Sequence, residues 1–444
     1  MAAAENAPSA TEIPPERQHL VVRSIVAATI GNALEFYDFI TYAFFAIQIG
    51  HAFFPKTTAY GSLMLSLATF GAGFITRPIG GIVIGAYSDR VGRRPAMMLS
   101  FTLMGCALIA IAIIPTYAQI GVFAPILAIL ARMVQGFSLG GEVGPTTAYL
   151  LESAPLKLRG LAVSWQGASQ GIAATTAGFV GFLLAAYLAP AALDSYGWRI
   201  AFLLGSVTLP FGLWIRNRLP ETLHDEEQHT VLVSKAETGL GAVRENYRII
   251  VLGLLVLASG TISTYVFDYL TTFAQSTLHL KPTVAFAAAT LLNLSGVVAV
   301  LCGGWLSDRI GRKPVMVVPN LCYLVLIYPV FLWIVQSRSA TALLVGAAGL
   351  AAVSTISTGA FYAALSETLP KRIRGGAFAT IYATSIALFG GTTQLVITWL
   401  IHVTHNPMAP AWYMLVATSI GTIAMMLIVE SSPARAVPRV AHAC

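Results

Sequence analysis

The chain has 444 residues, of which 56% are hydrophobic and only 10% are charged. An average soluble domain carries about 25% charged residues, so this composition excludes a water-soluble globular protein with an ordinary polar surface. The formal net charge of +7 suggests a nucleic-acid partner at first sight. The positions of the basic residues between the apolar segments give a different explanation.

Residues 1–19 are polar, mixed in charge and contain three prolines, which predicts that residues 1–21 form a disordered cytoplasmic tail. Hydrophobic runs of about 20 residues, the length that crosses a bilayer core, then recur along the chain. Only helices are plausible for these runs, because they show no period-two alternation and a backbone in lipid must satisfy its own hydrogen bonds. We predict helices over 22–50, 60–87, 95–114, 121–150, 161–188, 197–216, 247–276, 283–306, 314–335, 341–366, 377–402 and 411–430.

These twelve helices predict an all-α membrane protein made of two pseudo-symmetric six-helix bundles, residues 22–216 and 247–430. A charged cytoplasmic loop, 217–246, joins the bundles, and a cytoplasmic tail, 431–444, ends the chain. With both termini inside, twenty of the 26 Lys and Arg residues lie in cytoplasmic segments and only four lie outside. The positive-inside rule therefore predicts this orientation in a bacterial inner membrane, and it explains the net charge without any nucleic acid.

Two loops repeat one pattern. Asp89-Arg90-Val91-Gly92-Arg93-Arg94 follows the second predicted helix, and Asp308-Arg309-Ile310-Gly311-Arg312-Lys313 follows the eighth. Glu152 and Glu367 then precede an Arg-Gly pair at equal spacing in the two halves. Such duplication is typical of transporters built from parallel repeats, with a site between the halves near the midplane.

We expect the repeated charges to form an ion-pair lattice that latches a cytoplasmic gate in one state and releases it in another. Its predicted members are Asp89, Arg90, Arg93, Arg94, Glu152, Arg159, Asp308, Arg309, Arg312, Lys313, Glu367 and Arg374.

The duplicated loops resemble the signature of the major facilitator superfamily, over about residues 22–430. Four further segments resemble its metabolite:proton symporter subfamily, whose members carry citrate, tricarballylate, α-ketoglutarate, shikimate, and proline or betaine: Gly31–Asp38, Phe74–Gly80, Gln135–Ser138 and Ser164–Gln166. Gly85–Arg94, Phe53–Pro55 and Phe389–Gly391 are most similar to the citrate and tricarballylate carriers.

The resemblance implies proton-coupled uptake of a small carboxylate, with citrate or a related di- or tricarboxylate first. α-Ketoglutarate, shikimate, or a zwitterion such as proline or betaine is the alternative. A membrane sensor or lipid-processing enzyme is a competing class, but no convincing catalytic set supports it. Gly136-Phe137-Ser138-Leu139-Gly140 matches a nucleophile elbow, yet it lies within a predicted membrane helix, where spaced glycines indicate helix packing. We expect a monomer in the lipid bilayer with no cofactor, metal or nucleotide.

Charges at membrane depth are functional candidates, because each costs several kcal/mol unless it is paired or faces a wet cavity. The six candidates are Glu35, Asp38, Arg77, Arg132, Glu142 and Asp268. Glu142 is expected to have a structural or secondary coupling role. Asp268 is expected at the outer end of helix seven, in contact with water.

In related sugar:proton symporters an acid in helix one pairs with an arginine in helix four and takes the coupling proton. The resemblance implies these roles for Asp38 and Arg132. Glu35, one turn before Asp38, departs from that pattern, so either acid or both together could carry the proton. Protonation would free the arginine for an anionic substrate. The alternative is a static ion pair that fastens helix one to helix four.

Arg77 lies twelve residues before Asp89, about 18 Å along a helix, and hence near mid-membrane. Its planar fork suits a carboxylate; alternatively, it bonds carbonyls in a helix disturbed by Pro78. Gln166 and Gln170 share one face of helix five at i and i+4. Further substrate contacts are expected from both halves, although each alone could be a packing group: Tyr37, Tyr265, Asn293, Thr392 and Gln394.

Overall fold

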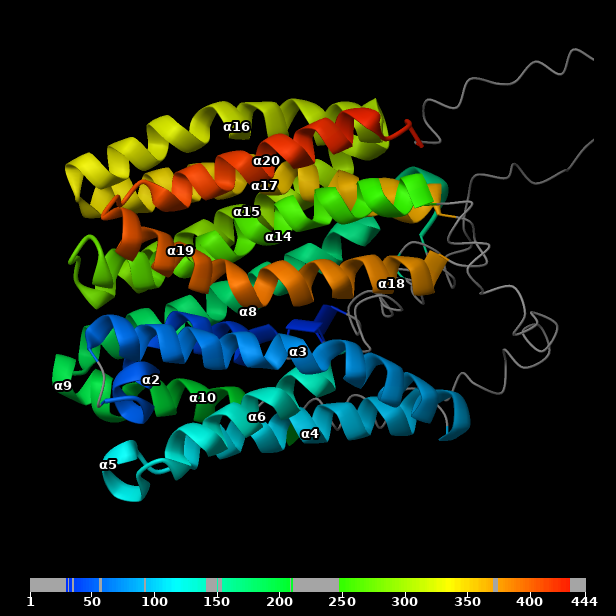
Figure 1. Ribbon diagram of the computed structural model, residues 1–444. Helices are drawn as coiled ribbons and strands as arrows, with labels where there is room; N and C mark the ends of the chain where they lie inside the picture. Colours follow the sequence, from blue (N-terminus) through cyan, green and yellow to red (C-terminus); the bar gives the residue numbers. More distant parts are fainter. Residues whose placement is uncertain are drawn as a thin grey trace, which may run out of the picture.

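The computed structural model describes residues 29–30, 32–33, 36–55, 58–91, 93–140, 150, 154–207, 209–210, 247–369 and 374–431. Within these ranges all regular secondary structure is helical. The long helices lie side by side with their axes roughly aligned (Figure 1). Eight described helices are long and apolar enough to cross a membrane, and two shorter apolar stretches, Met98–Ile113 and Phe123–Leu139, accompany them.

Where the structure describes them, the predicted spans agree with the helices to within a few residues; the spans 22–50, 121–150 and 197–216 extend into residues outside the described ranges. In the first half these are α2 (Ala46–Phe53), α3 (Ala59–Val91), α4 (Arg93–Ile113), α6 (Phe123–Leu139), α8 (Arg159–Tyr187) and α10 (Trp198–Ser206). In the second half they are α14 (Tyr247–Ser276), α15 (Pro282–Ile310), α16 (Arg312–Ser337), α17 (Ala340–Thr368), α18 (Arg374–Ser385), α19 (Gly391–Thr404) and α20 (Ala409–Leu427). Short elements lie in the connections: α5 (Tyr117–Ile120), η1 (Leu156–Leu158), α9 (Pro190–Ala192) and η2 (Leu193–Gly197).

Two predicted continuous spans are interrupted. Residues 36–44 of helix one are helical, but a turn at Phe45 separates them from α2. Helix eleven consists of α18 and α19 joined by η3 (Ile386–Gly390), a π-helical segment. π-Bulges are frequent at functional sites, and Ile386 of this segment lines the central cavity described below.

Glycines bring α3 and α6 into backbone contact. A Cβ atom on Gly136 would overlap the carbonyl of Gly73, and one on Gly140 would overlap the carbonyl of Arg77. The Gly136 and Gly140 stripe is therefore a packing surface, as predicted. The hydroxyl of Ser138, within this stripe, hydrogen-bonds to Ser100 of α4. This close contact fixes α3 and α6, which carry the two buried arginines, beside each other.

The two halves meet along α8 and α15, which contact each other over most of their length. Small residues again permit the approach: a Cβ on Gly160 would meet the carbonyl of Gly304, and one on Gly178 would meet Thr290. A second seam joins α3 to α19, where Gly71 approaches Gly391.

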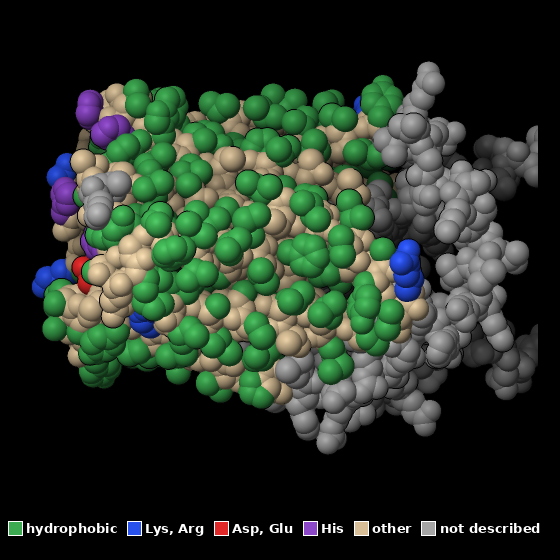
Figure 2. Space-filling model, turned by 60° about the horizontal axis from the view of Figure 1, so that its bottom comes forward, with side chains coloured by type: hydrophobic (Ala, Val, Ile, Leu, Met, Phe, Trp, Pro, Cys, Tyr) green, Lys and Arg blue, Asp and Glu red, His purple; other side chains and the backbone are tan. Residues whose placement is uncertain are grey.

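The flanks of the molecule are apolar. Hydrophobic side chains cover the face shown in Figure 2, whereas His, Lys, Arg and acidic side chains gather at its left end. Ile82 is 74% exposed and Val325 is 72% exposed, as expected for side chains that face lipid. We call the end with His51, His279, His402 and His405 the histidine end, and the opposite end, with Arg90 and Arg309, the motif end.

Candidate functional site

Two buried arginines share one aromatic ring. Arg77 of α3 is 6% exposed and Arg132 of α6 is 0% exposed. Their guanidinium carbons lie 4.5 Å and 4.7 Å from the centroid of the Phe39 ring. Phe74 flanks Arg77 at 4.5 Å, and Tyr42 flanks Arg132 at 4.4 Å. Cation–π contacts stabilise both cations, but they leave the N–H donors without acceptors.

The donors of these arginines are largely unused. Nη1 of Arg132 donates to Oε1 of Gln135 at 2.6 Å. Nε and Nη2 of Arg132, and the same two atoms of Arg77, have no hydrogen-bond partner among the described residues. A buried, unsatisfied guanidinium is strongly destabilising unless an anion pairs with it. Two adjacent forks of this kind can bind carboxylate groups bidentately. For Arg77, the two idle donor atoms, Nε and Nη2, count against a role in bonding helix carbonyls near Pro78.

Asp38 lies on the same helical segment as Phe39, and its side chain is 4% exposed. Its Oδ1 has no hydrogen-bond partner among the described residues. Asp38 and Arg132 influence each other electrostatically. The ion pairs of the described residues do not, however, include a contact within 4.0 Å between them. The acid is therefore beside the arginine cluster without being locked to it. Glu35 and Glu142 lie outside the described residues.

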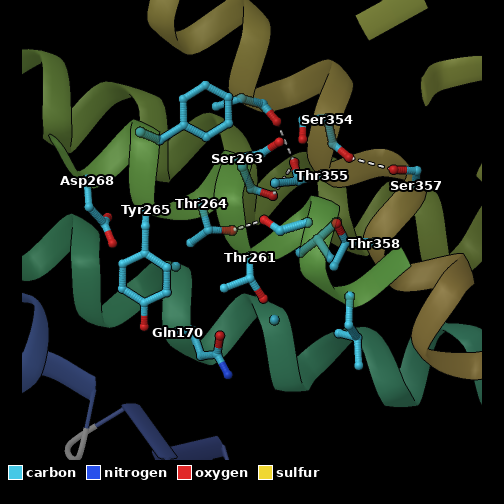
Figure 3. A pocket seen from close by; sticks show the side chains of 18 of the residues that line it. Gln170, Thr261, Ser263, Thr264, Tyr265, Asp268, Ser354, Thr355, Ser357 and Thr358 are labelled. Carbon is cyan, nitrogen blue, oxygen red and sulfur yellow. Dashed lines mark hydrogen bonds between the residues drawn. The ribbon is translucent and has the colours of Figure 1, made fainter. Parts of the chain in front are cut away.

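A cavity of about 160 Å³ lies between α8 and the helices of the second half. Three residues proposed from sequence line it: Gln170, Tyr265 and Asn293. Figure 3 shows Tyr265 on α14 facing Gln170 on α8. Nε2 of Gln170 donates to the hydroxyl of Tyr382 at 3.2 Å. The site thus draws on both halves, as a central site requires.

Most of the polar lining was not predicted. It consists of hydroxyl groups from α14 and α17: Ser259, Thr261, Ser263, Thr264, Ser354, Thr355, Ser357 and Thr358. Several also bond their own helix, as when Thr264 donates to the carbonyl of Gly260 at 3.0 Å. Membrane helices commonly contain Ser and Thr that bond in this way, so the sequence does not separate the cavity hydroxyls from packing groups.

An aromatic wall separates the cavity from the arginine cluster. Phe39 and Tyr265 both line the cavity. The ring of Tyr265 lies 5.6 Å from that of Phe74, which packs on Arg77.

The other proposed contacts lie elsewhere in this conformation. Nε2 of Gln166 donates to Oδ1 of Asn32 at 3.2 Å, which fastens α8 to helix one. The hydroxyl of Tyr37 donates to the carbonyl of Ala201 at 3.1 Å. Gln394 is buried, and its amide atoms have no partner among the described residues. Thr392 is exposed and donates to the carbonyl of Leu388, so it faces away from the cavity.

The expectation that Asp268 lies in water at a helix end was wrong. It is 5% exposed and lines the central cavity. The physical reason is that α14 packs against α15, α17, α18 and α20, which bury this part of its surface around the cavity.

The second-half loop forms a dense ion-pair cluster at the motif end. Arg312 donates from Nη1 to Asp308 at 2.6 Å, and from Nη2 and Nε to Glu367 at 2.8 Å and 3.1 Å. Asp308 also accepts from the backbone N–H groups of Gly160 and Leu161, at 2.8 Å and 2.9 Å. The carboxylate therefore bridges the halves by binding the N-terminus of α8, where the helix dipole favours negative charge.

Other members of the predicted lattice are arranged differently. The guanidinium of Arg309 lies 3.9 Å from the centroid of Trp305. Glu430, which the sequence pattern did not identify, accepts from the backbone N–H groups of Arg312 and Lys313 at 2.9 Å and 3.0 Å. Arg90 is exposed, and Arg159 is partly buried. The remaining predicted members lie outside the described residues or have side chains outside them: Asp89, Arg93, Arg94, Glu152 and Arg374.

Arg312→Ala is expected to lower the free energy of unfolding by about 3–5 kcal/mol, because it leaves two carboxylates without their buried counter-charge. Arg312 is 1% exposed in its pair with Glu367. Thermal unfolding in detergent micelles measures the effect. Arg309→Ala is the matched control, since Arg309 is exposed at the same end. Equal loss of stability in the two variants would contradict the prediction.

A second cavity, of about 560 Å³, lies at the histidine end. Two contacts between the halves border it: Nε2 of Gln48 donates to Oε1 of Gln275 at 3.4 Å, and Tyr60 stacks on His402 at 3.7 Å. A hydrogen bond to Asp194 raises the pKa of His51. Three histidines line this cavity, but the described residues contain no group of three metal-ligating side chains that could hold a metal ion.

Aligned apolar helices and a central cavity lined from both halves are consistent with a membrane transporter. Residues 28–302 match the family model described as Major Facilitator Superfamily. The citrate-proton symporter of Klebsiella pneumoniae is 35% identical over 405 residues, which cover 91% of this chain and 90% of that protein. The chain belongs to the major facilitator superfamily, and the resemblance to its citrate carriers is confirmed.

Other relatives carry other substrates. The glycine betaine/proline/ectoine/pipecolic acid transporter OusA of Dickeya dadantii is 30% identical over 92% of this chain and 83% of its own length. A crystal structure of a D-xylose-proton symporter matches with a TM-score of 0.73 at 17% identity, covering 94% of this chain and all of that one. The human organic anion transporter MFSD10 gives a TM-score of 0.61 at 18% identity, over 93% of this chain and all of that one. These two structures support the fold.

Proposed function

We propose that the chain takes up a small organic carboxylate, foremost citrate or a related di- or tricarboxylate, together with protons by alternating access. The observation that carries this proposal is a pair of buried arginines that pack on the same aromatic ring. Together they have four nitrogen donor atoms without a hydrogen-bond partner among the described residues. A substrate with several carboxylates supplies the acceptors that Arg77 and Arg132 lack. The similarity to citrate-proton symporters supports the same substrate class.

Proton coupling would follow from the position of Asp38. When Asp38 is ionised, its carboxylate attracts Arg132 and competes with the substrate for it. When Asp38 takes a proton, this competition ends and Arg132 is available to the anion. Asp38 and Phe39 are adjacent, so a movement of helix one reorients the acid and the ring that holds both arginines. Glu35 could share the proton with Asp38.

The central site would open alternately to the two sides of the membrane, and contacts at the two ends of the helix bundle would close the side that is not in use. Contacts between Asp308 and α8 would close the motif end, and the Tyr60–His402 stack would close the histidine end. We place the motif end and both termini in the cytoplasm of a bacterial cell, with the protein in the inner membrane as a monomer. The excess of Lys and Arg in the segments at that end supports this orientation.

A zwitterion such as betaine or proline is the second candidate. Asp268 and the aromatic lining, which includes Tyr265, Phe361 and Tyr362, could hold an ammonium group. A carboxylate of the same molecule could reach Arg77. Relatives described as proline/betaine transporters make this alternative concrete.

Counterflow in proteoliposomes separates the two candidates. Vesicles loaded with unlabelled citrate are expected to take up labelled citrate transiently, and vesicles loaded with unlabelled betaine are expected not to take up labelled betaine. A set of di- and tricarboxylates at two pH values then defines the preferred substrate. Counterflow of betaine without counterflow of any carboxylate would overturn the proposal in favour of the zwitterion. Empty vesicles are the control.

A further inference from the structure

The central cavity contains an acidic group that the proposed mechanism does not use. Thr261, Thr264, Tyr265 and Asp268 follow one face of α14 at helical spacing, and all four line the cavity. Figure 3 shows Asp268 and Tyr265 projecting from this helix toward the same space. Among the described lining residues, Asp268 is the one with a charged side chain.

The surroundings of Asp268 provide hydrogen-bonding groups but no cation. The polar side chains that line the cavity around it come from five helices: Gln170 of α8, Asn293 of α15, Asn320 of α16, Tyr362 of α17 and Tyr382 of α18. Helix one contributes the apolar residues Phe36, Phe39 and Ile40. η3 and α20 add Ile386 and Met425. The titratable neighbours in this described lining are the tyrosines. Arg77 lies on the other side of Tyr265 and Phe39, next to Phe74.

An ionised Asp268 therefore conflicts with an anionic substrate. A carboxylate buried at membrane depth without a cationic partner is unfavourable in itself. A second negative charge in the same small cavity adds repulsion: at about 6 Å and an effective dielectric of about 20, two unit charges weaken binding about a hundredfold. A proton on Asp268 removes this repulsion and turns the carboxyl into a hydrogen-bond donor for the substrate.

We propose that Asp268 is a second protonation site, in the second half of the protein, which must carry a proton for a carboxylate substrate to occupy the central cavity. This inference rests on the proposed carboxylate symport. The proton would enter from the side that delivers the substrate and leave after the substrate on the other side. The empty carrier would return with Asp268 ionised. Each cycle then moves one proton in addition to any that the helix-one acids carry.

The test is Asp268→Asn in proteoliposomes, because asparagine resembles the neutral acid but cannot release a proton. Citrate counterflow, which needs no net proton movement, is expected to persist at a reduced rate, because the substituted side chain lines the site. Accumulation under an imposed gradient of one pH unit is expected to fall about tenfold, because each coupled proton contributes a factor of ten. Asp268→Glu should restore the gradient response. Asp194→Asn, an exposed acid at the histidine end, is the matched control.

A second measurement, the number of protons moved with each citrate, tests the inference independently of the transport rate. The ratio of protons to citrate, obtained from the pH gradient at which net flux reverses, should fall by one in Asp268→Asn and in Asp268→Ser. An unchanged ratio in a variant that still performs counterflow would overturn the inference and leave carboxylate symport intact. Loss of citrate counterflow in both Asp268→Asn and Asp268→Ser, with Asp268→Glu active, would also overturn it, since the ionised form would then be required for binding. Failure of the wild-type protein to exchange any carboxylate would instead overturn the proposed function.

Discussion

Arg77→Lys is expected to raise the KM for citrate about thirty- to a hundredfold, with a smaller change in the maximal rate. Lysine keeps the charge, but its ammonium is a point donor that does not reproduce the planar fork of arginine. Losing one well-placed charge-assisted contact in a buried site costs about 2–3 kcal/mol. The packing of Arg77 on Phe39 and Phe74, each at 4.5 Å, is lost as well. Initial rates of citrate uptake over a range of concentrations measure both constants.

Arg338→Lys is the matched control for this experiment. Arg338 is exposed at the end of α16, far along the chain from either buried arginine, and its substitution should leave the KM unchanged. A wild-type KM in Arg77→Lys would show that Arg77 does not bind the substrate. It would favour the other interpretation, in which this guanidinium only stabilises α3 around Pro78.

Asp38→Asn is expected to lower the accumulation of citrate under a gradient of one pH unit at least tenfold, while counterflow of citrate persists. Asparagine imitates the protonated acid, so Arg132 stays available to the substrate and the site still exchanges it. The proton that Asp38 would carry in each cycle is lost, and a coupled proton contributes about a factor of ten per pH unit. Labelled citrate in vesicles with and without a pH gradient measures the difference.

Asp38→Glu is the companion variant, because it keeps a titratable group and should retain part of the gradient response. Expression and thermal unfolding of each variant show whether the protein is still folded. If Asp38→Asn accumulates citrate as wild type does, the acid in helix one has no part in coupling. The static role, in which it only fastens helix one to its neighbours, would then account for its burial.

Much of the fold could be predicted because lipid imposes a simple rule on the sequence. Each apolar run must be long enough to cross the bilayer and must bond its own backbone, so length and hydropathy identify the helices. The prediction for helix seven, 247–276, coincides with α14. The turn at Phe45 and the π-helical segment Ile386–Gly390 were missed. Both depend on local backbone geometry, and hydropathy is continuous through them.

The positions of the charged residues in the candidate site could be predicted from the sequence. A buried arginine is rare enough in a membrane helix to be noticed in the sequence, and both Arg77 and Arg132 are indeed buried together. That they share the ring of Phe39 could not be foreseen, because phenylalanine is common in membrane helices. Asp268 was misplaced because its depth was judged from its distance along one helix. Its burial depends on how α14 packs against other helices, which one sequence does not specify.

The seam between α8 and α15 has a mechanical consequence. On the α8 side the contact is made largely by glycines, which have no side chain to disengage: Gly160 lies against Gly304, Gly171 against Val297 and Gly181 against Phe286. The α8 side of this contact therefore offers little steric hindrance to tilting of one bundle over the other. The free-energy barrier for rocking one bundle against the other would then be set mainly by the polar contacts at the two rims, so the turnover of the carrier could be tuned there while its affinity for the cargo stays fixed.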